Sequence, residues 1–126
     1  MEKIKIYCVT NKPIGFLNDT KYNLAWVGKE ESPKNYFKCD SQENIFYKEK
    51  YYSELTFHYW YWKNLLKHEK DDCWIGFCQK RRYWIKENTS EKIDSSNLNK
   101  YLLTDTEKEW KNFDSLICNP IQISGA

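Results

Sequence analysis

The sequence predicts an α/β fold built on parallel strands. Three observations support this prediction. Residues 3–10 have the pattern of a strand entering a sheet, and residues 73–78 form a short, continuous apolar run. An aromatic-rich helical pattern lies between them, at residues 54–68. Parallel strands need a long crossover, usually helical, and their strands are buried on both faces, so we expect a β…αβ unit.

The first strand is expected at residues 3–10, where apolar and lysine side chains alternate before the chain becomes continuously apolar. Asn11, Pro13 and Gly15 then end it. Residues 16–52 are rich in Asn, Asp, Lys and Ser, which predicts a long, mostly irregular surface loop with one short strand at residues 24–27.

Ser53 is expected to cap a helix that runs from Glu54 to about His68. Helical spacing places side chains on three stripes: Leu55, Tyr59, Trp62 and Leu66; Phe57, Trp60 and Tyr61; and Glu54, His58 and Tyr61. A helix that is apolar on two faces is either buried on several sides or presents its second face to a partner or ligand.

The remaining elements follow a break at residues 70–72. Residues 73–78 are expected to form a buried parallel strand, and residues 87–97 a loop. We expect a weak helix at residues 98–103, a short helix at 107–113, and a last strand at 114–123 that bends at Pro120.

Composition and charge argue against several classes of protein. The net charge of +2 is too small for a dedicated binder of nucleic acid or anionic membranes. No apolar run is long enough to span a bilayer, and residues 1–6 lack the apolar segment of a signal peptide, so we expect a cytosolic protein. Five cysteines without zinc spacing predict free thiols.

The most informative candidate site follows the 73–78 strand, at Gln79-Lys-Arg-Arg-Tyr-Trp84. In open α/β sheets, ligands bind beyond the carboxyl ends of parallel strands. Arg81 and Arg82 could clamp a diphosphate, because guanidinium groups match phosphate oxygens, and Tyr83 could line a base or sugar. The alternative is a solvated basic strand end.

Other candidates have equally simple alternatives. Thr10, Asn11 and Lys12 end the first strand at the same sheet edge, where they could meet a nucleotide or form an ordinary turn. Glu54 could hydrogen-bond sugar hydroxyls or orient an arginine, or could only favour the helix dipole. His58 and His68 are too far apart on one helix to share a metal, so a satisfied or solvated histidine is favoured.

The order of these segments resembles a family of bacterial glycosyltransferase-like proteins linked to capsular and other surface-polysaccharide synthesis. The matching segments are Lys5-Ile-Tyr-Cys-Val-Thr-Asn-Lys12, Glu54-Leu-Thr-Phe-His-Tyr-Trp-Tyr-Trp-Lys-Asn64, Ile75-Gly-Phe-Cys-Gln-Lys-Arg-Arg-Tyr-Trp84 and Phe113-Asp-Ser-Leu-Ile-Cys-Asn-Pro120. Gln79-Lys80 and Asn11 replace a His-Tyr pair and a histidine of the family pattern.

This resemblance implies a GT-A-like, Rossmann-type sheet of mainly parallel strands with flanking helices. The family's domain is longer than this chain, so residues 1–126 are expected to be a single glycosyltransferase-like domain that corresponds to the N-terminal portion, with an incomplete sheet. By the resemblance, Thr10, Asn11 and Lys12 lie near the nucleotide. Glu54, Arg81, Arg82 and Tyr83 border the sugar-diphosphate, and Trp60, Tyr83 or Trp84 shapes an apolar wall. Gln79 is also expected to contact the substrate.

The implied activity is transfer of a sugar from a nucleotide-sugar donor to a glycan or lipid-linked glycan acceptor. Such transfer uses either positively charged side chains or a divalent metal to neutralise the diphosphate. The chain has no Asp-x-Asp motif, so these residues predict no metal site, and no catalytic residue is assigned. One alternative is a non-catalytic carbohydrate- or nucleotide-binding module. Another is an aromatic and basic surface that binds single-stranded nucleic acid by stacking on its bases, although the low net charge argues against it.

Overall fold

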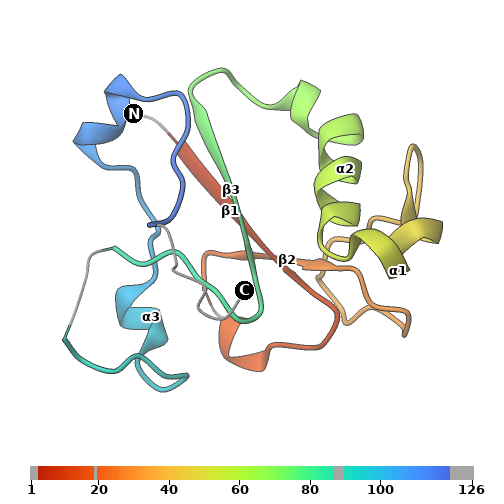
Figure 1. The fold of residues 1–126 in the computed structure, drawn as a ribbon, viewed down its shortest axis with the longest axis horizontal. Coiled ribbons are helices and arrows are strands. Elements are labelled where there is room, and N and C mark those ends of the chain that lie inside the picture. Colours follow the sequence, from red (N-terminus) through yellow and green to blue (C-terminus); the bar gives the residue numbers. More distant parts are fainter. Residues whose placement is uncertain (1–2, 19, 87–89, 120–126) are drawn as a thin grey trace, which may run out of the picture.

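The computed structural model describes residues 3–18, 20–86 and 90–119, which form an α/β fold around a three-stranded parallel sheet (Figure 1). The strands are β1 (Lys3–Thr10), β2 (Asn23–Trp26) and β3 (Cys73–Gln79), in the order β2-β1-β3. This arrangement confirms the predicted α/β class and is that of a partial Rossmann-like sheet with flanking helices.

β1 is the central strand and sets the position of the other two. It pairs in parallel with β2 from Tyr7↔Asn23 to Thr10↔Trp26, and with β3 from Lys3↔Cys73 to Val9↔Gln79. A central parallel strand is covered on both faces, which explains why residues 6–10 are all buried. The carboxyl ends of β1 and β3 therefore lie at the same edge, as the sequence predicted.

Each face of the sheet has its own core, and Figure 1 shows α1 and α2 on one side of the sheet and α3 on the other. On the first face, α2 (Leu55–Asn64) packs Phe57 and Tyr61 against Tyr7, whose ring lies 5.0 Å from that of Tyr61. On the second face, Leu98 of α3 (Leu98–Tyr101) joins a cluster with Ile6 and Leu17.

The start of the predicted long helix differs from the expectation. Ser53 does not cap α2; it ends a short helix, α1 (Glu49–Tyr52), by donating its backbone N–H to the Glu49 carbonyl at 2.8 Å. Ser53 has a φ of 49°, so the chain turns there and α2 starts after Glu54 without a side-chain cap. Ser53 therefore serves as a junction between two helices.

The helix also ends earlier than predicted, at Asn64, and a separate 3₁₀ turn covers Leu66–His68. The Asn64 side chain donates a hydrogen bond to the Trp60 carbonyl at 2.9 Å and another to the Glu43 carbonyl at 2.8 Å. Such side-chain bonds compete with the backbone ladder, so they offer a physical reason for the end of the regular helix.

Residues 16–52 are not simply a surface loop. They contain the buried strand β2, which confirms the short strand predicted there, and they contain α1. The backbone of Phe37 accepts a hydrogen bond from the Trp26 N–H and donates one to the Leu24 carbonyl, both at 2.8 Å. Cys39 is buried in the first core. This packing could not be predicted from the polar composition of residues 16–52, because only a few apolar side chains of the segment are buried in the cores.

The last part of the chain confirms two predictions and contradicts one. Residues 98–101 and 108–112 are helical, the latter as a 3₁₀ helix. The strand expected at 114–123 is absent from residues 114–119, and residues 120–123 lie outside the described part. A strand needs ladder partners, and in the described segments the backbone of residues 114–119 has no hydrogen bond to β3.

Candidate functional site

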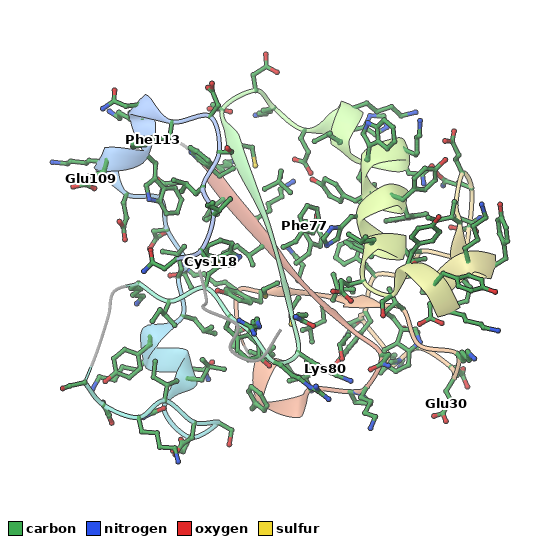
Figure 2. All side chains as sticks on the ribbon, viewed as in Figure 1. Glu30, Phe77, Lys80, Glu109, Phe113 and Cys118 are labelled. Atoms are coloured by element: carbon green, nitrogen blue, oxygen red, sulfur yellow. The ribbon has the colours of Figure 1, made fainter. Side chains whose placement is uncertain are left out.

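A cleft of about 430 Å³ opens at the carboxyl end of β3, between the start of α2 and the segment that follows β3. Its lining comes from four parts of the chain: Glu54, His58, Phe77, Cys78, Gln79, Arg82, Tyr83, Trp84 and Cys118. In Figure 2, Phe77 lies on β3 on the side toward α2, and Lys80 lies at the tip of the strand. The cleft is therefore at the edge where the sequence placed a ligand.

A tight turn after β3 shapes this cleft. Arg82 donates its backbone N–H to the Gln79 carbonyl at 3.0 Å, and Gln79 donates its own to the Arg82 carbonyl at 3.3 Å. This two-residue reversal places Lys80 and Arg81 at the tip. The Trp84 indole N–H then donates to the Phe77 carbonyl at 2.9 Å, which holds the returning segment against β3.

The turn separates the two predicted arginines. Both arginines are exposed, but Arg82 lines the cleft, whereas Arg81 lies at the tip and is not among the lining residues. Within residues 3–18, 20–86 and 90–119, the side chains of Arg82, Glu54 and Gln79 have no hydrogen bond or ion pair. Three polar groups, from the residue before α2, from β3 and from the turn, thus border one cleft without a hydrogen-bond partner in the described part of the chain.

Aromatic side chains form the apolar part of the lining. Tyr83 and Trp84 are half-buried, and the Tyr83 hydroxyl donates to the Lys80 carbonyl. Burial raises the pKa of Tyr83 to about 12, so its phenol stays neutral. A flat apolar wall beside a guanidinium suits a ligand that is both ringed and anionic.

The sequence prediction missed His58 as a site residue. Its ring lies on that of Phe77, with 4.2 Å between the ring centroids, and it lines the cleft. Burial lowers the pKa of His58, while the nearby Glu54 carboxylate has the smaller, opposing effect. The available signal was the spacing of four residues between Glu54 and His58, which puts both on one helix face.

The residues at the end of β1 hold the sheet edge and do not line the cleft. Thr10 is buried, and its hydroxyl donates to the Lys12 carbonyl at 2.6 Å and accepts from the Lys12 N–H at 3.0 Å. Asn11 accepts a hydrogen bond from Lys80, which links the tips of β1 and β3. The geometry supports the turn interpretation for Thr10.

Trp60 lies in the first core and is likewise not among the residues that line the cleft. Its indole N–H donates to the Ser41 carbonyl at 3.0 Å, and its ring packs 5.8 Å from that of Phe57. Burial with a satisfied polar tip is the usual state of a structural tryptophan.

A second, larger cleft of about 820 Å³ runs along the outer edge of β3. Its lining includes Trp74, Ile75 and Trp110 and the acidic residues Asp71, Asp72 and Glu107. None of the predicted site residues lines it. All five cysteines are free thiols, and no three His, Cys, Asp or Glu side chains gather as metal ligands within the described segments.

A search of the described residues for a helix long and apolar enough to cross a membrane found none. Comparisons with curated proteins and with solved structures found no match. The chain does match the family described as "Domain of unknown function (DUF4422)" over residues 5–121, a span that includes β2, β3, all but the first two residues of β1, and all the residues of the cleft. The chain therefore belongs to the DUF4422 family.

Proposed function

We propose that this chain acts as a glycosyltransferase, moving a sugar from a nucleotide-sugar donor to a glycan or lipid-linked glycan of a surface polysaccharide. The observation that carries the proposal is the cleft at the end of β3, where the unpaired Arg82 guanidinium and Glu54 carboxylate stand beside an aromatic wall. A nucleotide-sugar offers matching groups: a diphosphate, hydroxyls and a flat base.

In this proposal, Arg82 and Gln79 bind the diphosphate, and Arg82 stabilises the charge that develops as the nucleoside diphosphate leaves. Tyr83 and Trp84 provide faces for the base or sugar, and Glu54 hydrogen-bonds hydroxyl groups. Lys80 and Arg81, at the tip of the turn, add positive potential near the entrance.

Two further considerations support the proposal. The cleft lies beyond the carboxyl end of a parallel strand, the usual ligand position in open α/β sheets. The segments that resemble the polysaccharide glycosyltransferases, residues 54–64 and 75–84, contribute eight of the nine lining residues. The proposal retains the cytosolic location and the absence of a nucleic-acid ligand that we expect from the sequence.

Binding of nucleotide-sugars tests the assignment of Arg82. We expect Arg82→Ala to weaken binding of a nucleoside diphosphate about tenfold or more, because hydrogen bonds to charged groups contribute about 1.5–3 kcal/mol. Arg81→Ala is the matched control, since it removes the same charge from the exposed tip, and we expect about a two- to threefold loss. Titration calorimetry measures both, and equal losses would contradict the assignment.

Turnover separates an enzyme from a binding module. Incubation with a panel of nucleotide-sugars and oligosaccharide acceptors should release nucleoside diphosphate, and this release should fall in Arg82→Ala. Binding of donors or free glycans without any turnover would favour the non-catalytic carbohydrate- or nucleotide-binding module. Salt-sensitive binding to single-stranded nucleic acid alone would contradict both.

A further inference from the structure

His58 brings an unsatisfied imidazole to the cleft. Its Nε2 atom is buried and has no hydrogen-bond partner. Within the described part of the chain, the other ring nitrogen, Nδ1, has no hydrogen bond either, but it retains accessible surface. Buried polar atoms without partners are rare and cost about 1–3 kcal/mol each, so such an atom in a cleft needs an explanation.

Packing alone does not explain this histidine. Phe77 contacts the ring face, and a phenylalanine at position 58 could make the same contact without an unpaired nitrogen. Residues that lower stability in this way are typical of sites kept for function. His58 also lines the cleft, and Nδ1 is its nitrogen with accessible surface and no hydrogen bond within the described residues, so Nδ1 is the atom that a ligand in the cleft can meet.

The chemistry of the surrounding groups indicates which part of a ligand it meets. Glu54 lies one helical turn before His58, so α2 contributes a carboxylate and an imidazole that burial keeps neutral. A phosphate is repelled by the carboxylate and attracted by Arg82 on the turn. A neutral imidazole has one N–H and one lone pair, and a hydroxyl can donate or accept, so a hydroxyl pairs with either tautomer.

We propose that His58 is a specificity-determining residue that hydrogen-bonds a sugar hydroxyl of the bound ligand, and that Glu54 and His58 together form the hydroxyl-recognising part of the cleft. Arg82 and Gln79 form the part that meets the diphosphate. This inference rests on the proposed function and assigns each part of a nucleotide-sugar to a different element of the fold.

The variant His58→Phe tests this assignment, because it keeps a ring on Phe77 and removes both nitrogens. We expect its affinity for the nucleotide-sugar that the wild type binds best to fall about tenfold, and its affinity for the matching nucleoside diphosphate to stay within about twofold. Its melting temperature should be unchanged or higher, since an unpaired buried nitrogen is lost. His68→Phe, at an exposed histidine, is the control and should change neither affinity.

Each outcome decides the proposal. Unchanged nucleotide-sugar affinity in His58→Phe overturns it, and so does an equal loss for nucleotide-sugar and nucleoside diphosphate, which would indicate a change in cleft shape. If His58→Phe does not fold, His58→Gln and His58→Ala replace it. Because Gln can still hydrogen-bond a hydroxyl, His58→Gln should bind the nucleotide-sugar more tightly than His58→Ala does, while both bind the nucleoside diphosphate equally; equal nucleotide-sugar affinities overturn the proposal. Absence of nucleotide-sugar binding in the wild type instead overturns the proposed function itself.

Discussion

At the scale of single residues, one charged group connects three parts of the fold. Glu69 accepts hydrogen bonds from Lys5 of β1, at 2.8 and 3.0 Å, and from the buried Tyr61 hydroxyl of α2, at 2.8 Å. The hydrogen bond from Lys5 lowers the pKa of Glu69 below its ordinary value of 4.5. Burial and the bond to Glu69 raise the pKa of Tyr61, which keeps its phenol a donor.

Replacing Glu69 by Gln should therefore lower the free energy of unfolding by about 1–2 kcal/mol at neutral pH. Because the folded state lowers the Glu69 pKa, this contribution is present above pH 4.5 and is lost as the pH falls through the lowered value. The gap between wild type and variant should close in acid. Urea denaturation at neutral and acidic pH measures it.

Glu43 provides the matched control for that experiment. Its carboxylate lies 3.6 Å from the Lys63 amine, and it is 58% exposed, against 14% for Glu69. Exposed ion pairs contribute little, so Glu43→Gln should change stability by no more than about 1 kcal/mol. A larger loss of stability in Glu43→Gln than in Glu69→Gln would show that the exposure of these two carboxylates does not determine their contributions to the free energy of unfolding.

At the scale of elements, α2 turns one of its two aromatic faces inward. Phe57, Trp60 and Tyr61 are buried against the sheet, whereas Leu55 is 53% and Trp62 is 56% exposed. Both faces have helical spacing, so the pattern established a helix without stating which face packs. In the structure, the face with Phe57 packs against the sheet, where the Phe57 ring contacts the rings of Tyr7 and Phe77.

This asymmetry predicts very different costs for two aromatic substitutions on α2. Phe57→Ala should lower the free energy of unfolding by about 3–5 kcal/mol, because a fully buried ring leaves a cavity. Trp62→Ala should cost no more than about 1 kcal/mol, from its contact with the Lys63 amine. Urea denaturation compares them, and similar costs would mean that the outer face of α2 is also packed in solution.

At the scale of the whole molecule, β3 pairs with β1 along one edge, and its other edge has no strand partner within residues 3–18, 20–86 and 90–119. The backbone N–H and C=O groups of successive strand residues point alternately to the two edges of the strand. Gln79 exchanges backbone hydrogen bonds with Arg82 on the edge away from β1. The amides of Ile75 and Phe77 point the same way, into the large cleft, and have no backbone partner within the described segments. The amides of Trp74, Gly76 and Cys78 face β1.

Amide hydrogen exchange should therefore alternate along β3. The amides of Gly76 and Cys78 should exchange slowly, and those of Ile75 and Phe77 at least about tenfold faster, because ladder hydrogen bonds protect only the first pair. Residue-resolved exchange by NMR measures this at low protein concentration. Uniform protection along the strand would mean that another strand pairs with the open edge.

The sequence by itself determined the parallel sheet, the helix between its outer strands and the edge at which the cleft lies. Strand and helix periodicities are local, so the strand at 73–78 and a helix starting near residue 54 could be recognised from the order of residues alone, although the pattern extended the helix to His68 and it ends at Asn64. Glu54, Gln79, Arg82 and Tyr83 were also within reach, because the ends of such elements follow from the same patterns.

Only the tertiary structure decided which of these side chains meet. A two-residue turn sends Arg82 into the cleft and leaves Arg81 outside, and the inward face of α2 buries Trp60 and brings His58 to Phe77. These outcomes depend on packing between segments far apart in the chain, and local periodicity contains no information about such contacts.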